Sequence, residues 1–340
     1  MFRNPFVFIL PSALVLLLAL VLVWPPPLQR AEAWLRYRIT GFVPPPIVVG
    51  RNDRLFLGNH PGNPPGSLIA DVCGTRVGAA DIANSAALIQ PILAAGKATG
   101  LPFKFLIVPT APRIYPEDLP AGTPCTDPAA DRLVAALNNP AVDYPVGFMQ
   151  TLKLRFDVLP RHHFHWAGEG PLRVAEQVSD LMGLDRITNI PLRPDNRSSD
   201  LNGFDPGLGV HDRIGTPNLR AVGVEQCDST RCRPPLPPSL VQFSRTGPQR
   251  ILVIADSFGD EIAGDFTEYA GAVWLLQMNV ALSEPPGLIA PLLHGFHPDA
   301  IVVVYHDAGA LALDAGSQAS LALAASLITD AALPRRSASP

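Results

Sequence analysis

Short apolar runs that alternate with longer segments of helical period constrain the fold of this chain most. Runs of strand length occupy residues 103–108, 250–256, 272–278 and 300–305. Segments with apolar residues at helical spacing occupy residues 79–97, 258–269, 288–296 and 317–332. Because strands that alternate with helices form parallel sheets with helical crossovers, the pattern predicts an α/β fold with a mainly parallel sheet.

The amino-terminal segment is apolar enough to cross a membrane. Residues 5–24 carry no charged side chain, and a helix of about 20 residues matches a hydrocarbon core of roughly 30 Å. We expect residues 1–25 to form a transmembrane anchor; a cleaved signal peptide is the alternative. Counting arginines would place the body in the cytoplasm, because several follow the apolar run and only Arg3 precedes it.

The rest of the chain divides by composition. The proline-rich residues 26–47 predict an extended stalk, because proline fixes φ and lacks an N–H donor. Residues 48–332 are then one α/β domain. Within it, residues 186–249 are rich in Asn, Asp, Gly, Pro and Ser and have weak periodicity, so we interpret them as a long loop or insertion. We expect residues 333–340 to be a disordered tail.

Charge and cysteine content narrow the function classes. The formal net charge is −4, and no cluster of Lys and Arg has interleaved aromatic residues, so nucleic acid is not an expected partner. Cys227 and Cys232 bracket a polar turn that a local disulfide would close, with free buried thiols as the alternative. No cysteine or histidine spacing is typical of a metal site, and we expect neither a metal nor a cofactor.

Ser257 lies where α/β folds place reactive residues. The run Ile251 to Ala255 predicts a buried strand, and Asp256 and Ser257 follow it immediately before a predicted helix. Ligands of open α/β sheets bind at the carboxyl ends of the strands, and N–H groups at a helix start can stabilise an oxyanion. Ser257 is therefore our candidate nucleophile, although Asp-Ser after a strand is also an ordinary helix cap.

A serine nucleophile needs a base, and one short segment supplies histidines. His162, His163 and His165 lie just before a helix predicted to begin near Gly170. We interpret His165 as the base, which would accept the Ser257 proton with one ring nitrogen while a neighbour holds the other. A structural histidine cluster is the second interpretation, and a metal site is the third.

Four stretches of the sequence resemble the alginate O-acetyltransferase group of periplasmic SGNH-hydrolase-like proteins, the AlgX/AlgJ-like family. They are GRNDRLFL from Gly50, LIVPTAPRIYPEDLP from Leu106, FHW from Phe164, and ADSF from Ala255. Together they span most of the chain beyond the predicted stalk. The resemblance implies an SGNH-hydrolase-like, three-layer α/β/α fold.

The resemblance also implies roles for single residues. Ser257 corresponds to the nucleophile that takes up the acetyl group, and His165 to the base. His163 stands where the family has its triad aspartate, and a histidine can orient His165 but cannot supply a negative charge. We therefore expect a substitute carboxylate, with Asp157 and Glu169 as local candidates, or a slower serine–histidine dyad, or a loss of activity.

Three further residues are candidates for substrate contact or structural support. Asp256 precedes the nucleophile, and Trp166 follows the base. Tyr115 matches a tyrosine of the family, with a buried core position as the alternative. The family's tryptophan near the first motif is replaced here by Arg54.

The function implied by the resemblance is O-acetylation of an exported or cell-surface polysaccharide through an acetyl-serine intermediate. The expected partners are the polysaccharide and a multi-spanning membrane acyltransferase that provides the acetyl group. The expected location is the inner membrane, with a single span and the catalytic domain in the periplasm. This orientation is opposite to the one that counting arginines predicts. A carbohydrate acetylesterase and a non-catalytic subunit of a polysaccharide-export complex are the alternatives.

Overall fold

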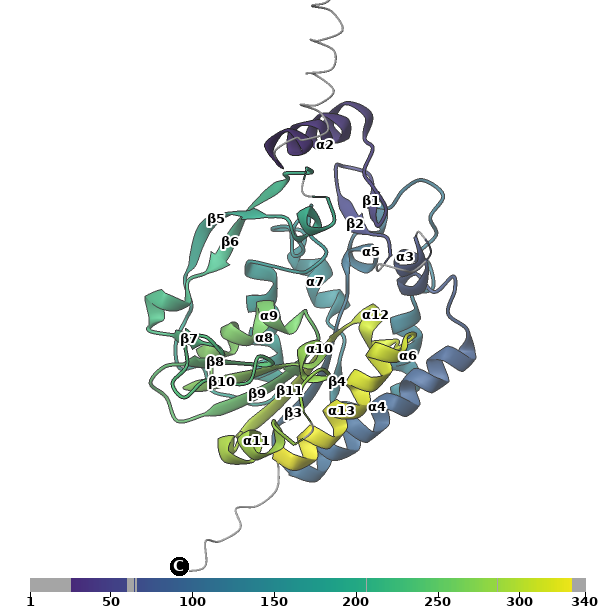
Figure 1. The fold of residues 1–340 in the computed structure, drawn as a ribbon. Helices are drawn as coiled ribbons and strands as arrows, with labels where there is room; N and C mark the ends of the chain where they lie inside the picture. Colours follow the sequence, from purple (N-terminus) through teal and green to yellow (C-terminus); the bar gives the residue numbers. More distant parts are fainter. Residues whose placement is uncertain (1–25, 60–63, 65, 206, 286, 332–340) are drawn as a thin grey trace, which may run out of the picture.

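A seven-stranded mixed sheet forms the centre of the computed structural model, which describes residues 26–59, 64, 66–205, 207–285 and 287–331. Its order is β4-β3-β11-β9-β10-β8-β7 (Figure 1). The strands are β3 (Phe103–Val108), β4 (Val142–Asp143), β7 (Glu225–Cys227), β8 (Leu240–Ser244), β9 (Arg250–Ala255), β10 (Ala272–Gln277) and β11 (Ala300–His306). From β4 to β10 all neighbours pair in parallel, whereas β8 pairs antiparallel with β10 and β7 antiparallel with β8.

Helices cover both faces of this sheet. Successive residues of a strand point to opposite faces, and in β9 Ile251 packs into one hydrophobic cluster and Leu252 into another. The first cluster includes α8 (Glu169–Leu181), and the second includes α4 (Ala79–Thr99) and α13 (Ala315–Ala331). Figure 1 shows α4 and α13 side by side. Burial on both faces explains why the central strands read as continuous apolar runs.

The strand predictions are confirmed to within one residue at each end. The helices predicted at residues 79–97, 288–296 and 317–332 are α4, α11 (Ala290–Phe296) and α13. The single helix predicted at residues 258–269 is wrong, because α9 (Gly259–Ile262) gives way to a 3₁₀ helix, η4 (Ala263–Glu268). Gly264 lies at this change, and glycine weakens an α-helix by about 1 kcal/mol relative to alanine.

Several other elements are short. They are β1 (Ile47–Val49), β2 (Leu55–Leu57), α3 (Ser67–Val72), α5 (Ala111–Ile114), η1 (Pro116–Asp118), α6 (Ala129–Leu137), α7 (Val146–Leu152), α10 (Met278–Ala281) and α12 (Asp307–Ala310). β1 and β2 form a separate antiparallel pair.

The extended stalk predicted for residues 26–47 is wrong over most of its length. Pro26 and Pro27 begin a helix, α2 (Pro26–Thr40). Proline is tolerated in the first turn because its missing N–H would have no partner there, and good helix formers follow. The predicted membrane anchor lies outside the described residues. Within the described part of the chain, every helix is either too short or too polar to span a bilayer.

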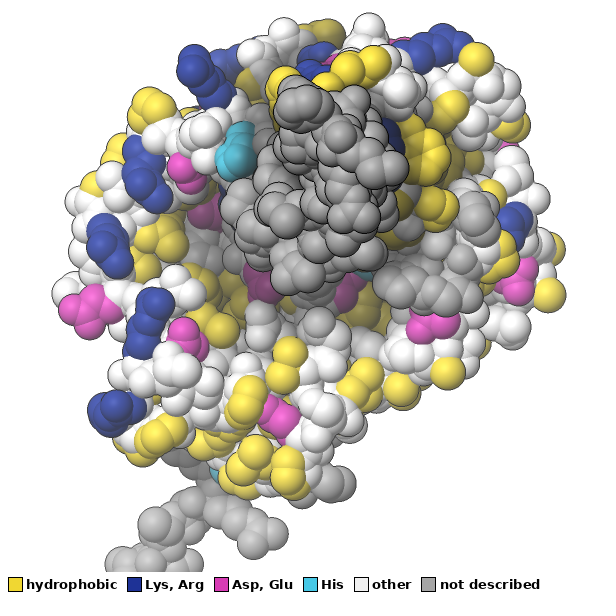
Figure 2. All heavy atoms as spheres, turned by 45° about the horizontal axis from the view of Figure 1, so that its top comes forward, with side chains coloured by type: hydrophobic (Ala, Val, Ile, Leu, Met, Phe, Trp, Pro, Cys, Tyr) yellow, Lys and Arg dark blue, Asp and Glu magenta, His cyan; other side chains and the backbone are white. Residues whose placement is uncertain are grey.

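Residues 186–249, called the insert below, contain strands that the sequence pattern did not reveal. An antiparallel ribbon of β5 (Leu192–Ser198) and β6 (His211–Pro217) is followed by η3 (Leu219–Val222), β7 and β8. Between β5 and β6 lies a 3₁₀ helix, η2 (Asp200–Gly203). The ribbon has polar residues on much of both faces, which removes the alternation that marks a half-buried strand. The basic residues of the insert are all arginines, and Figure 2 shows basic side chains in dark blue along the left edge of the molecule.

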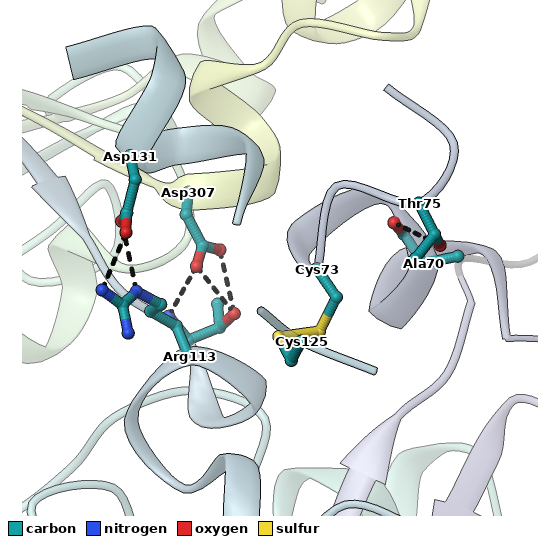
Figure 3. The surroundings of a disulfide bond; sticks show 8 residues. Ala70, Cys73, Thr75, Arg113, Cys125, Asp131 and Asp307 are labelled. Atoms are coloured by element: carbon teal, nitrogen blue, oxygen red, sulfur yellow. Dashed lines mark hydrogen bonds and ion pairs between the residues drawn. A yellow bond between two sulfur atoms is a disulfide. The ribbon is translucent and has the colours of Figure 1, made fainter. Parts of the chain in front are cut away.

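Two disulfides crosslink the chain. The predicted Cys227–Cys232 bridge is confirmed. A second bridge joins Cys73, at the end of α3, to Cys125 in the loop that follows η1 (Figure 3). Near it Asp307, after β11, accepts hydrogen bonds from the N–H and hydroxyl of Thr110, after β3. These contacts tie the ends of two adjacent strands together.

Candidate active site

Ser257 lies at the carboxyl edge of the sheet, directly after β9. Asp256 closes the turn that carries it, because its Oδ1 accepts the N–H of Phe258 at 2.9 Å and its carbonyl accepts the N–H of Gly259. The Ser257 side chain is partly exposed, whereas Phe258 is fully buried. The turn therefore presents the hydroxyl to solvent while the next side chain anchors it in the core.

His165 meets Ser257 as the sequence predicted. Its Nε2 lies 2.8 Å from the Ser257 Oγ, within hydrogen-bond distance. The two residues come from segments 92 positions apart, and His165 lies just before α8. A serine hydroxyl at this distance can donate to Nε2, which requires the proton of the neutral imidazole to be on Nδ1.

Asp200 holds the other side of the His165 ring. Its Oδ2 lies 2.6 Å from His165 Nδ1 and also accepts the main-chain N–H of His165, while its Oδ1 accepts the N–H of Phe164. Burial by itself would raise the pKa of Asp200, but the hydrogen bond and charge of His165 outweigh it and lower that pKa. Asp200 is therefore ionised at neutral pH and fixes the tautomer in which Nε2 can accept a proton.

The sequence-based candidates for this third position are wrong. His163 is buried, and its two ring nitrogens each lie 3.8 Å from a carboxylate oxygen, one of Asp200 and one of Asp212. Burial lowers the pKa of His163, despite these two carboxylates. Asp157 forms ion pairs with Arg54 and Arg161. Glu169 pairs with Arg173 on the first turns of α8.

Asp256 also binds His306, in addition to closing the turn that carries Ser257. Its Oδ2 lies 2.6 Å from Nδ1 of His306, the last residue of β11, and accepts the N–H of the same residue at 2.9 Å. Burial by itself would lower the pKa of His306, but the charge and hydrogen bond of Asp256 outweigh it and raise that pKa. Asp256 thus joins two adjacent strand ends beneath the nucleophile.

Aromatic residues pack beneath the histidine and the serine. Trp166 is fully buried and donates its Nε1–H to the Phe258 carbonyl at 2.8 Å. The His165 ring lies 5.0 Å from the rings of both Phe164 and Phe258. Trp166 is therefore a support for the base and the nucleophile turn, and its burial excludes direct substrate contact.

Tyr115 also belongs to the core. Its ring is 5% exposed, its hydroxyl accepts the N–H of Val158, and the Arg54 guanidinium lies 3.5 Å from the ring centroid. Arg54 is 1% exposed and bridges Asp118 and Asp157. The core alternative for Tyr115 is the observed one, and Arg54 is a structural residue there.

Asp200 is the residue that reasoning from sequence missed. It lies in η2, within the insert. The local sequence around Asp200 gives only a weak signal. Ser199 caps the 3₁₀ helix by accepting the N–H of Leu201, and Asp200 is the acidic residue of the first turn. Such caps occur at many helix starts, and nothing local indicates that this one faces His165.

This fold occurs in several solved structures. The O-acetyltransferase domain of Pseudomonas putida AlgJ matches with a TM-score of 0.52 and 15% identity, over 82% of this chain and 99% of that one. Bacillus cereus PatB1, in a structure with a sulfonyl adduct, matches with a TM-score of 0.53 and 13% identity, over 78% and 96%. The chain shares the fold of these proteins.

A DHHW family protein from Eubacterium siraeum matches in the same way, with a TM-score of 0.53 and 12% identity, over 69% of this chain and 88% of that one. No protein-family model matches the sequence, and no curated protein matches it. The resemblance to the AlgX/AlgJ-like O-acetyltransferases, inferred from short motifs, is therefore confirmed at the level of the fold.

Proposed function

We propose that the chain is a serine O-acetyltransferase that modifies hydroxyl groups of a polysaccharide. The observation that carries the proposal is the line of hydrogen bonds from Ser257 Oγ through His165 to Asp200, with distances of 2.8 and 2.6 Å. The fold shared with the O-acetyltransferase domain of AlgJ supports it. This line contains the nucleophile, base and orienting carboxylate that acyl transfer requires.

The first half-reaction loads the serine. Ser257 Oγ attacks the acetyl carbonyl of the donor ester while its proton moves to His165 Nε2, and Asp200 stabilises the imidazolium that forms. The donor oxygen then leaves and takes the proton from His165. The N–H groups of Phe258 and Gly259 already donate to Asp256, so the Ser257 N–H is the donor from this turn that we assign to the oxyanion.

The second half-reaction transfers the acetyl group to the acceptor. A sugar hydroxyl attacks the acetyl carbonyl and gives its proton to His165, and Ser257 Oγ leaves and recovers that proton. With water as the acceptor, the same steps yield acetate and describe a carbohydrate acetylesterase. The non-catalytic alternative rested on the missing triad aspartate, and Asp200 removes that reason.

For the cellular setting we propose a periplasmic domain on the inner membrane, which receives acetyl groups from a separate multi-spanning acyltransferase. The apolar residues 5–24 would provide the span. Trp34, Ile39 and Phe42, in and after α2, are 48%, 72% and 52% exposed, as suits a helix next to a lipid surface. The two disulfides are consistent with an oxidising compartment.

Intact mass measurement tests the nucleophile. The full chain in detergent, incubated with an activated acetyl ester such as p-nitrophenyl acetate, should gain one acetyl group on Ser257, and Ser257→Ala should gain none. Ser283→Ala, on an exposed hydroxyl that donates to the Val280 carbonyl, is the matched control and should behave as wild type. An adduct that persists in Ser257→Ala would disprove the assignment.

Adding acceptors distinguishes transferase from esterase. With neutral and uronic acid oligosaccharides in the mixture, a transferase accumulates acetylated sugar, whereas an esterase releases acetate at the same rate with and without sugar. Mass spectrometry of the sugars and an enzymatic acetate assay measure the two products. Acetate as the sole product with every sugar would favour the esterase.

A further inference from the structure

The histidine–aspartate geometry of the catalytic pair occurs three times around this site. In His165–Asp200, one carboxylate binds both Nδ1 and the main-chain N–H of one histidine, at 2.6 and 2.9 Å. His306–Asp256 repeats both contacts at 2.6 and 2.9 Å. His162–Asp212 repeats them at 2.8 Å for each. A carboxylate that binds both groups fixes the backbone and the ring of its histidine together.

The His162–Asp212 pair lies at the start of the segment that carries the base. Asp212 comes from β6, and Asp200 follows β5, so the ribbon of the insert holds this segment at two points. Ser199 adds a third point, because its hydroxyl donates to the His162 carbonyl. The backbone position of His165 therefore depends on the insert along the whole segment.

The His306–Asp256 pair lies directly beneath the nucleophile. Asp256 bonds to the end of β11 through Oδ2 and to the Phe258 N–H, across Ser257, through Oδ1. The His306 ring stacks on the Phe258 ring with centroids 4.9 Å apart, and it lies nearly perpendicular to the Phe164 ring with centroids 5.6 Å apart. His306 thus contacts Phe258, which follows Ser257, and Phe164, which precedes His165.

We propose that these two outer pairs are positioning pairs, with His162–Asp212 setting the place of the base and His306–Asp256 that of the nucleophile. Neither His162 nor His306 transfers a proton in this scheme. Each holds one side of the Ser257–His165 contact, and a misplacement of about 1 Å can slow a reaction about 10²-fold. The inference rests on the proposed function.

The charges around each outer histidine favour its charged form. His162 lies between Asp212 and Asp53, the latter 3.4 Å from its Nε2. Burial by itself would lower the pKa of His162, but Asp212 and then Asp53 outweigh it and raise that pKa. His306 faces Asp256, Asp307 and Asp314, which together raise its pKa against the effect of burial. A charged histidine strengthens each hydrogen bond to its aspartate.

Paired substitutions of the outer histidines separate positioning from simple packing. Asparagine places a donor where Nδ1 stood, whereas glutamine places its amide near the position of Nε2. We expect His306→Gln and His162→Gln to slow the modification of Ser257 about 10- to 100-fold, and His306→Asn and His162→Asn to retain most of the wild-type rate. The measurement is the rate of adduct formation on the full chain, by intact mass.

Two reagents keep the inference distinct from the proposed function. The acetyl ester reports the proposed reaction, and phenylmethanesulfonyl fluoride reports only that Ser257 is activated. If sulfonylation occurs without acetylation, O-acetyl transfer is wrong, and the positioning inference is still decided by the sulfonylation rates. A wild-type chain that reacts with neither reagent overturns both.

The matched control is Asp299, which lies at the edge of the sheet where β9 and β11 begin, opposite the active site. Asp299 accepts the N–H of Arg250, at the start of β9, so Asp299→Asn also removes a carboxylate that binds a strand end. It should leave both rates unchanged. For each variant the rate is measured from pH 5 to 9, and loss of positioning should lower the rate by the same factor at every pH. Glutamine variants that react as fast as wild type would overturn the inference.

Discussion

At the scale of single residues, Asp200 determines how strongly Ser257 is activated. It is the carboxylate that binds His165 Nδ1, at 2.6 Å. An asparagine there would favour the wrong imidazole tautomer, and the corresponding change in serine proteases lowers kcat about 10⁴-fold. We expect Asp200→Asn to slow Ser257 acetylation by about 10³- to 10⁴-fold, as measured by stopped-flow release of p-nitrophenol.

The matched control for this change is Asp157→Asn. Asp157 was a local candidate for the same role, but it pairs with Arg54 at 3.2 Å and is 42% exposed. Its substitution should leave the acetylation rate within about twofold of wild type, since a partly exposed ion pair contributes little. The opposite ranking of the two variants would show that Asp200 does not orient the base.

Prediction from sequence succeeded for Ser257 and His165, because each lies in a recognisable short motif. Ser257 follows a strand whose apolar run is continuous, which predicts a place at the carboxyl edge of the sheet. His165 was assigned because a serine nucleophile needs a base and because its motif resembles that of the family. Asp200 acts on a histidine 35 positions away. Its role depends on how the insert docks, and docking leaves no periodic signal in the sequence.

At the scale of elements, the strands of the central sheet could be predicted from the sequence, whereas the strands of the insert could not. The central strands are buried on both faces and consist of apolar runs, which identify them almost to the residue. β5 and β6 have polar residues on much of both faces, so their pairing leaves no hydrophobic alternation. α2 differs from the predicted extended stalk because its prolines occupy the first turn, where they do not break a helix.

The prediction at the scale of elements is that α2 lies next to the membrane. Tyr37 faces the body and donates its hydroxyl to Asp53, while Arg36 bonds to Asp205 of the insert. Trp34 lies 48% exposed on the same helix. In full chains reconstituted in phospholipid vesicles, in a Trp24→Phe background, we expect phospholipid brominated near the headgroup to quench the fluorescence of Trp34.

The control for this measurement is Trp34→Phe in the same background, which should remove the quenched component. Trp166 is fully buried and Trp274 stacks on Phe296 at 4.3 Å, so both should give an unquenched background. Equal fluorescence in brominated and ordinary lipid would contradict the membrane-proximal placement of α2.

At the scale of the whole molecule, the two disulfides should stabilise the fold unequally. Cys73–Cys125 closes a separation of 52 residues and Cys227–Cys232 one of 5. In the chain-entropy model these loops correspond to about 4 and about 2 kcal/mol of unfolding free energy. Replacing both cysteines of a pair by serine should therefore lower stability more for the first pair, as measured by urea unfolding of the full chain in detergent.

The two double variants control for each other, since each removes one bridge and adds two serines. A larger loss for the Cys227–Cys232 pair would show that packing in the folded state, rather than loop closure, determines the contribution of these bridges.

The histidine–aspartate pairs also predict how stability depends on pH. The pKa of Asp212 is lowered by His162, against the effect of burial, so its contribution is present above its ordinary pKa of about 3.9 and is lost as the pH falls through the lowered pKa. The pKa of His162 is raised, so its contribution is present below about pH 6.5 and is lost as the pH rises through the raised pKa.

The stability difference between wild type and Asp212→Asn should therefore be largest between about pH 4 and pH 6.5 and shrink on both sides. Urea midpoints across this range measure it, and Asp299→Asn provides the comparison at an exposed carboxylate. A difference that does not change with pH would show that Asp212 acts by packing alone.

Asp212 lies on the ribbon of the insert and Asp200 lies in η2, between its two strands, so heating should abolish activity before it unfolds the central sheet. The ribbon lies outside the central sheet, and an element with few buried apolar side chains opens before the core does. Once it opens, β9 still carries Ser257, but His165 has lost its carboxylate and its backbone supports. Thermal inactivation should therefore begin several degrees below the melting temperature of the sheet. Between these two temperatures the protein would be largely folded but catalytically inactive.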